Sequence, residues 1–145
     1  MSQLTPLADA LERILSGVAP VSATERRPLM ESLGAVLATD VVSAVQVPQD
    51  DNSAMDGYAL RVIDAPGPLP VSQRIPAGVV GEALLPGTAA RIFTGAAIPP
   101  GADAVVMQEQ CIEVDGQVRI DAEPAPGQNI RPSGQDIRLG ETVLG

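Results

Sequence analysis

From Gln46 onward, a glycine or a proline interrupts the sequence every few residues. Fourteen glycines and fourteen prolines among 145 residues disfavour long helices, because glycine raises the entropic cost of ordering a helix and proline lacks an amide donor. Short strands joined by turns fit this spacing better. We therefore expect a small β-barrel or β-sandwich in this part of the chain.

The expected strands are short apolar or β-branched runs between these interruptions. The clearest is segment 111–120, where two alternating runs flank Asp115-Gly116, a pair typical of a type I′ hairpin turn. Four further segments are predicted as strands: 58–63, 70–74, 88–93 and 104–108. Because Phe93 and Tyr58 are the only aromatic residues, the core between these strands must be largely aliphatic.

The region before residue 46 has a different pattern. Apolar residues recur at helical spacing, which predicts a helix over residues 5–16 with Thr5 as its N-cap and Ser16-Gly17 at its exit. The apolar stripe of this helix consists of Leu4, Leu7, Ala8, Leu11, Ile14 and Leu15. A shorter helix is expected over 28–33, followed by a strand or an extended linker over 36–45.

The predicted fold is therefore mainly β with N-terminal helices. Residues 1–45 form the helical and extended segment, and residues 46–140 form the small barrel-like or sandwich-like β domain. Residues 141–145 begin a return linker.

Composition excludes several classes of function. The chain has no histidine and no lysine, which removes histidine-based hydrolase triads, the usual zinc sites, and P-loop or Schiff-base lysine chemistry. A net charge of −9 disfavours binding to nucleic acid or to an anionic membrane. The single Cys111 suits a reducing compartment, and we see neither a signal peptide nor a membrane-spanning run. We expect a cytoplasmic protein.

Four polar clusters interrupt the β region. Segment 48–59 contains three carboxylates, which are ligands suited to magnesium or calcium, and segment 94–103 follows a predicted strand. There, Thr94 and Gly95 could offer a hydroxyl and free backbone amides to a ligand. In segments 127–131 and 133–136, Arg131 could bind an oxyanion while Asp136 binds a metal or orients Arg131.

Each cluster also has a purely structural explanation. The acidic segment could be an Asx-rich turn that caps its own backbone, and segment 94–103 could be an ordinary strand connection. Arg131 and Asp136 could form a surface ion pair worth under about 1 kcal/mol. Composition alone leaves these alternatives open.

The order and spacing of the clusters resemble the N-terminal part of the molybdopterin molybdenumtransferases, the bacterial MoeA proteins related to the gephyrin E domain. The resemblance rests on Asp-Asn-Ser-Ala-Met-Asp-Gly-Tyr-Ala at 51–59, Arg-Ile-Phe-Thr-Gly-Ala at 91–96 with Gly-Ala-Asp-Ala-Val-Val at 101–106, and Gly-Gln-Asn-Ile-Arg at 127–131 with Gly-Gln-Asp-Ile at 134–137. Members of that family continue into an α/β pterin-binding domain, so the resemblance implies a chain truncated before that domain.

The resemblance also implies a reaction: molybdenum from molybdate is inserted into adenylylated molybdopterin, with Mg²⁺ as cofactor and release of AMP. The implied catalytic residues are Asp56 and Thr94, the metal ligands are Asp56 and Asp136, and the substrate-binding residues are Arg131, Ser53 and Gly95. Ser53 is expected above all to shape its loop together with Asn52. The family forms homodimers with sites between subunits, so this chain would supply half a site and be inactive alone.

Two other functions remain open: a non-catalytic assembly module, like the scaffolding relative gephyrin, and a regulatory oxyanion sensor. The catalytic interpretation requires Asp56, Thr94, Arg131 and Asp136 to lie on one face of the β domain. A scattered arrangement would favour the scaffold.

Overall fold

The computed structural model describes residues 5–145, and Leu4 of the predicted apolar stripe lies outside them. The chain divides into two compact units, the first ending at Thr39 and the second running from Asp40 to Gly145. The division predicted from the sequence, at residues 45 and 140, stays a prediction.

The first unit contains helix α1 (Leu7–Ser16), as its apolar spacing predicted. Its N-cap position is Pro6, with φ −55° and ψ 146°, and no side chain caps the helix. The prediction of Thr5 as N-cap is wrong, because extended backbone at Pro6 delays the helix start by one residue. Within the unit, no residue of α1 is buried.

The second predicted helix, 28–33, is only the 3₁₀ turn η1 (Leu29–Glu31). Pro28 before it has extended backbone, and Gly34 after it has φ +84°, so the sequence leaves room for a single turn. In the second unit, the expected strand or linker over 36–45 contains a two-residue strand, β1 (Val41–Val42), which pairs with β10 (Thr142–Leu144).

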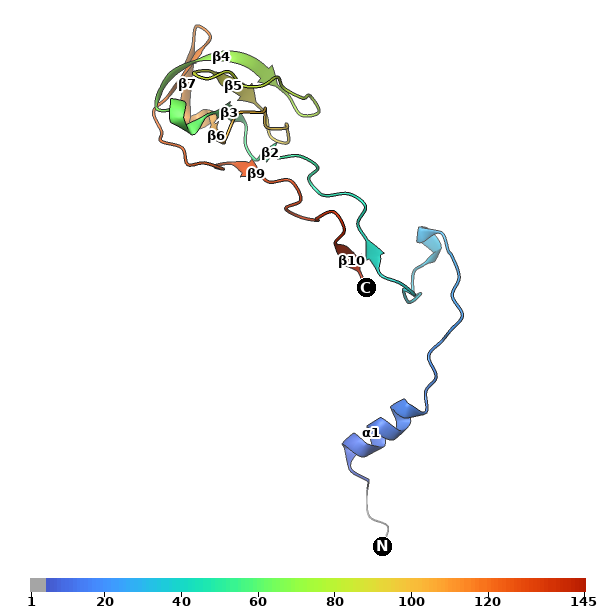
Figure 1. Cartoon of the computed structure of the whole chain (residues 1–145). Helices are drawn as coiled ribbons and strands as arrows, with labels where there is room; N and C mark the ends of the chain where they lie inside the picture. The colour runs from blue at the N-terminus through green and yellow to red at the C-terminus, as the bar shows by residue number, and fades with distance from the viewer. Residues whose placement is uncertain (1–4) are drawn as a thin grey trace. The chain divides into compact units, whose positions relative to one another are not determined.

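A six-stranded sheet dominates the second unit, and it contains every strand predicted from segment 58 to segment 120 (Figure 1). Its order is β6-β3-β5-β4-β8-β7. The bounds are β3 (Gly57–Leu60), β4 (Gly67–Ile75), β5 (Ala89–Ile92), β6 (Ala104–Met107), β7 (Cys111–Val114) and β8 (Gln117–Ile120). Strands β3 and β6 are shorter than predicted, because the chain turns into the 3₁₀ segments η2 (Val62–Asp64) and η3 (Gln108–Gln110).

The long strand β4 curls the sheet. Its first half pairs with β8, and its second half pairs in parallel with β5. Val71 lies opposite Ala89 and Gln73 lies opposite Ala90, so β4 carries one extra residue at Ser72. A bulge of this kind bends a strand and reverses which face the following residues occupy. Leu69 and Ile75 accordingly belong to different cores, although alternation alone would place both on one face.

These two cores lie on opposite faces of the sheet and are aliphatic apart from Tyr58, as expected. One core comprises Tyr58, Leu60, Leu69, Ala89, Val106, Val118 and Ile120. The other comprises Ala59, Ile75, Leu84, Ala90, Ile92, Ala96 and Val105. Each fully buried Leu, Ile or Val contributes about 1.5–3 kcal/mol. The prediction of a mainly β fold with a small barrel-like or sandwich-like β domain is confirmed, and the structure shows this domain as a curled sheet.

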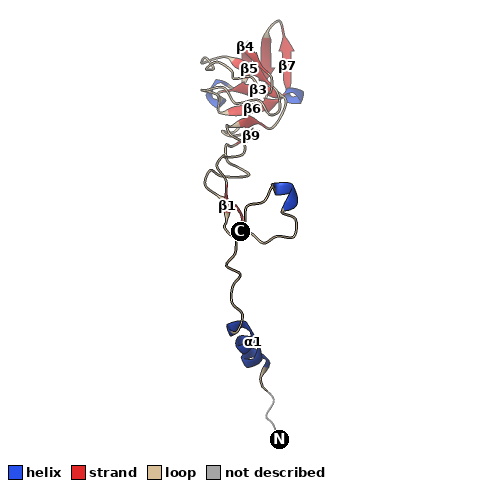
Figure 2. Cartoon of the chain, turned by 90° about the vertical axis from the view of Figure 1, so that its right-hand side faces the viewer, coloured by secondary structure: helices blue, strands red, loops and turns tan. Residues whose placement is uncertain are grey.

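The pairing of the acidic segment with the third polar cluster was not predicted. Within the acidic segment 48–59, β2 (Asn52–Ser53) pairs with β9 (Ile130–Arg131) in the third polar cluster. Figure 2 shows β9 next to β6, consistent with the hydrogen bond from the Val105 amide to the Gln128 carbonyl. The backbone thus joins polar clusters that are almost 80 residues apart in sequence. None of the helices in residues 5–145 has the length and apolarity needed to cross a membrane.

Candidate functional site

Asp56 and Thr94 lie at the same end of the sheet, because the strands that carry them are antiparallel neighbours. Gly57, which follows Asp56, pairs with Ile92, two residues before Thr94. The Thr94 amide and the Thr94 hydroxyl each donate a hydrogen bond to Asp56 Oδ1, at 2.8 Å and 2.8 Å. The two predicted catalytic residues therefore form one contact pair.

This contact keeps the Asp56 carboxylate ionised. The amide of Thr94 contributes most to lowering the pKa of Asp56 below its ordinary value of 3.8, and the Thr94 hydroxyl adds to it. Burial opposes the shift, and the charge of Arg91 reinforces it. Within the described chain, Asp56 Oδ2 accepts no hydrogen bond, so this oxygen can serve a ligand.

Close backbone packing fixes the position of Asp56. Gly57 is the first residue of β3, and a Cβ atom placed on it would lie 2.0 Å from the carbonyl oxygen of Val106. Any larger residue would push β3 away from β6. The glycine therefore lets β3 and β6 approach closely at the residue that directly follows Asp56.

Ser53 and Gly95 connect this pair to the β2–β9 ladder. The Ser53 hydroxyl donates to the carbonyl of Met55 at 2.6 Å, and the buried Ser53 side chain shapes the loop. The Gly95 amide donates to the Ser53 carbonyl at 2.8 Å. Because the Thr94 and Gly95 amides both have intramolecular partners, the expectation that they are free for a ligand is wrong.

Arg131 and Asp136 form a second contact pair, an ion pair with side chains 47% and 43% exposed. The β2–β9 register places Arg131 opposite Asn52, so these two side chains project from the same face of the ladder. Ser53 and Ile130 occupy the other face, toward the core. Local backbone bonds hold the pair, including one from the Asp136 amide to the Val47 carbonyl at 2.9 Å.

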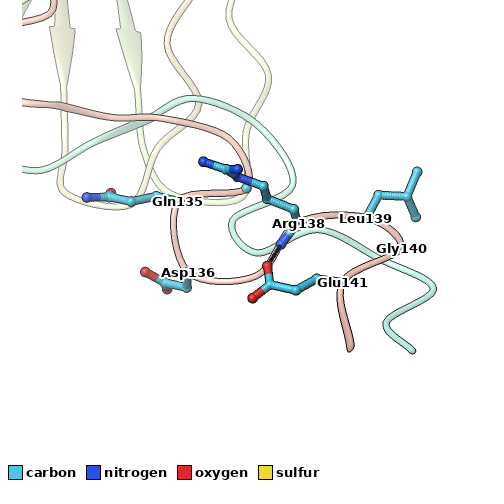
Figure 3. A pocket seen from close by; sticks show the side chains of 7 residues that line it. Gln135, Asp136, Arg138, Leu139, Gly140 and Glu141 are labelled. Carbon is cyan, nitrogen blue, oxygen red and sulfur yellow. Dashed lines mark hydrogen bonds between the residues drawn. The ribbon is translucent and has the colours of Figure 1, made fainter. Parts of the chain in front are cut away.

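A cavity of about 480 Å³ adjoins Asp136. Its lining residues are Gly134, Gln135, Asp136, Arg138, Leu139, Gly140 and Glu141. Figure 3 shows these side chains and the hydrogen bond from the Arg138 amide to Glu141 Oε2, at 2.9 Å. A smaller cavity of about 300 Å³ is lined by Asn52, Gly95 and neighbouring loop residues.

The predicted site residues thus form two contact pairs that the backbone of β2 connects. Asp56 and Asp136 belong to different pairs, and residues 5–145 contain no group of three or more acidic, histidine or cysteine side chains arranged for a metal. The donor set at Asp56 nevertheless fits magnesium, which binds through one or two carboxylates and completes its shell with water and substrate phosphates. The placement of all four side chains on one face stays a prediction.

Sequence reasoning missed Arg91, Phe93 and Arg74 as candidate site residues. Arg91 Nη1 donates to the carbonyl of Gly57 at 2.8 Å and to the carbonyl of Ile92 at 3.1 Å. The Arg91 guanidinium carbon lies 4.5 Å from the centre of the Phe93 ring, and that of Arg74 lies 4.5 Å from the same ring. The alternation of Arg91 and Phe93 along a strand was a usable signal, but the pairing with Arg74 required the topology.

The chain is similar in sequence to known proteins over most of its length. Residues 5–145 match the family model described as the MoeA N-terminal region (domain I and II). The molybdopterin molybdenumtransferase of Haemophilus influenzae is 39% identical over 95% of this chain and 35% of its own length. Molybdopterin molybdenumtransferase 2 of Mycobacterium tuberculosis is 45% identical over 81% of this chain and 31% of its own length.

A solved structure of a protein from the same family has a similar fold. A crystal structure of the molybdopterin biosynthesis MoeA protein from Pyrococcus horikoshii OT3 matches with a TM-score of 0.85 and 39% identity, over 98% of this chain and 40% of that chain. The chain therefore spans about a third of the length of the curated relatives it matches.

Proposed function

Because its sequence matches the family model from residue 5 to residue 145, the chain belongs to the MoeA N-terminal region family, and we propose that it acts in molybdenum cofactor biosynthesis. In this proposal the chain is part of a molybdopterin molybdenumtransferase, which inserts molybdenum from molybdate into adenylylated molybdopterin and releases AMP. The names of its relatives and the polar pair at the end of β3 and β5 support this assignment.

The observation that carries the proposal is the contact between Asp56 and Thr94. Cleaving a phosphoanhydride next to an incoming oxyanion requires an anionic oxygen that can hold a divalent cation and a donor fixed toward developing charge. Asp56 Oδ2 would hold Mg²⁺, which would supply positive charge to the phosphate oxygens. The Thr94 hydroxyl, which donates its one proton to Asp56 Oδ1, would orient the carboxylate, and its oxygen lone pairs would be available to the metal shell.

The second pair would act beside the first. Arg131 would bind an oxyanion of the substrate, and Asp136 would hold the Arg131 guanidinium in place or contribute a metal ligand. Ser53 and Gly95 would shape the substrate-binding loop through their mutual hydrogen bond.

We also propose that this site is half of a complete one. The pterin-binding half would come from a second subunit of a cytoplasmic homodimer, so the 145-residue chain by itself would not turn over. Molybdenum insertion by the isolated chain would contradict this part of the proposal.

A full-length protein that carries this chain as its N-terminal region is the test system. We expect Asp56→Ala to lower molybdenum insertion by at least about 100-fold while the protein remains folded, as for the loss of a group that stabilises transition-state charge. Asp121→Ala is the matched control, because Asp121 is exposed and pairs with Arg119 on β8. Insertion by Asp56→Ala at the control rate would instead favour a non-catalytic assembly role.

A further inference from the structure

The ring of Phe93 stacks with two guanidinium groups. The guanidinium carbons of Arg74 and Arg91 are each 4.5 Å from the ring centre, so they are no more than twice that distance apart. Arg74 and Arg91 are also in register on the neighbouring strands β4 and β5, which places both side chains on the same face of the sheet. Two positive charges brought this close repel each other unless an anion joins them.

The chain offers many acidic partners, yet neither arginine of this stack forms an ion pair, and Asp56 acts on Arg91 only through its nearby charge. In the second unit, Arg61, Arg119 and Arg131 each form an ion pair with an aspartate. No ion pair of Arg74 or Arg91 occurs in residues 5–145, although the chain has 18 acidic residues and a net charge of −9.

The two guanidinium groups differ in how their donors are used. The Nη atoms of Arg91 donate hydrogen bonds to the carbonyls of Gly57 and Ile92 and to the side chain of Gln108, so the charge of Arg91 is fixed in place. The Arg74 guanidinium is exposed and donates no hydrogen bond within the described part of the chain. A guanidinium stacked on a ring keeps its N–H edge free, and that edge matches two oxygens of a phosphate-like anion.

We propose that Arg74, Phe93 and Arg91 form a binding site for a tetrahedral oxyanion. Arg74 donates two hydrogen bonds to the anion, Arg91 supplies a fixed positive charge, and the Phe93 ring stacks with both guanidinium groups. The site adjoins the Asp56–Thr94 pair, because Phe93 directly precedes Thr94 and Arg91 bonds to the carbonyl of Gly57.

The oxyanion chemistry is shared by a substrate phosphate group and by molybdate. Its assignment to either substrate rests on the proposed function, whereas anion binding by the stack does not. Arg91 is partly balanced by the nearby Asp56 carboxylate, so Arg74 contributes the larger share of the binding.

Phe93 reports on this site directly, because it is the only phenylalanine of the chain. We expect its ring proton NMR signals in the 145-residue chain to shift saturably during titration with inorganic phosphate, AMP or sodium molybdate, against sodium chloride at equal ionic strength. Preference for AMP and phosphate over molybdate assigns the site to the substrate's phosphate group, and the reverse order assigns it to molybdate.

Arg74→Gln should weaken the apparent affinity by at least about tenfold, as expected when a charge-assisted two-pronged contact is lost. Arg119→Gln removes the same charge from β8 and should change affinity by less than about twofold. If Arg74→Gln does not fold, Arg74→Lys replaces it, with a several-fold loss expected because lysine keeps the charge without the planar fork.

Two outcomes would overturn the site: no saturable shift of the Phe93 signals with any of the three anions, or equal affinities for the Arg74 and Arg119 variants. Neither outcome would contradict the proposed function, because that function is tested separately by molybdenum insertion with the Asp56 variant. Conversely, a saturable, Arg74-dependent shift would stand even if molybdenum insertion proved independent of Asp56.

Discussion

Replacing Gly57 with alanine should destabilise the second unit (Asp40–Gly145) more than any surface substitution. The added Cβ would lie 2.0 Å from the Val106 carbonyl oxygen and 2.9 Å from its carbon, both backbone atoms that cannot turn aside. An unstrained carbon–oxygen contact needs about 3.3 Å, so β3 and β6 would have to separate by more than about 1 Å. That movement breaks hydrogen bonds in a ladder that runs from Gly57 to Leu60.

The expected cost combines two contributions. Overpacking costs about 1–3 kcal/mol, and two lost backbone hydrogen bonds cost about 0.5–1.5 kcal/mol each, giving about 2–6 kcal/mol in the free energy of unfolding. A domain of this size has about 5–15 kcal/mol in total, so the variant would be marginal.

Urea unfolding followed by tyrosine fluorescence measures this loss, since Tyr58 is the only tyrosine, the chain has no tryptophan, and Tyr58 lies in the second unit. Gly17→Ala is the control: its Cβ would meet the Ile14 carbonyl at 3.5 Å, an ordinary contact, and should change stability by less than about 0.5 kcal/mol. A loss below about 1 kcal/mol for Gly57→Ala would refute the close-approach explanation.

Three further predictions follow from perturbed side chains. Burial and the Glu113 carboxylate raise the pKa of Tyr58 to about 12, so its absorbance titration should have a midpoint near that pH and should shift down in Glu113→Gln. Because the pKa of Tyr58 is raised in the folded chain, protonated Tyr58 contributes stability that is present below pH 10.0 and is lost as the pH rises toward 12. A titration midpoint near pH 10 would contradict the raised pKa. Because the pKa of Asp56 is lowered in the folded chain, its carboxylate contributes stability above pH 3.8, and this contribution is lost as the pH falls through the pKa of the folded state. Carboxyl ¹³C NMR should show that Thr94→Val raises the pKa of Asp56 in the folded state. An unchanged titration of Asp56 would exclude the contact with the Thr94 hydroxyl. Burial raises the pKa of Cys111 to about 11, which lowers the fraction of reactive thiolate at pH 8. Iodoacetamide at pH 8, followed by mass spectrometry, should therefore label the folded chain at least about tenfold more slowly than the urea-unfolded chain. Equal labelling rates would count against the burial of Cys111.

Much of the fold was predictable because its signals are local. Asp115 and Gly116 both have positive φ, at 51° and 75°, as a type I′ turn requires, and the hairpin of β7 and β8 surrounds them as predicted. The other predicted strands were found because glycine and proline mark their ends. What local signals could not give is the bulge at Ser72, which depends on how β4 divides its pairing between β5 and β8.

For the candidate site, the sequence pointed to residues but not to their arrangement. Asp56 and Thr94 stand out as polar residues at strand ends, and their contact follows from the antiparallel pairing of β3 and β5. The two-residue strand that joins Ser53 to Ile130 is too short to show alternation, so a polar loop was expected there. The partnership of Arg74 with Phe93 depends on a parallel pairing across a long loop, which no local pattern encodes.

The central claim is that Asp56 and Thr94 act as one unit, and a double-mutant cycle on molybdenum insertion tests it most directly. In a full-length protein that carries this chain, Asp56→Asn, Thr94→Val and the double variant would be compared with the unmodified sequence at equal folded concentration. Groups that act together lose activity non-additively, so the double variant should insert molybdenum within about threefold of the slower single variant. Losses that multiply, or an Asp56→Asn protein as active as the unmodified one, would contradict the account.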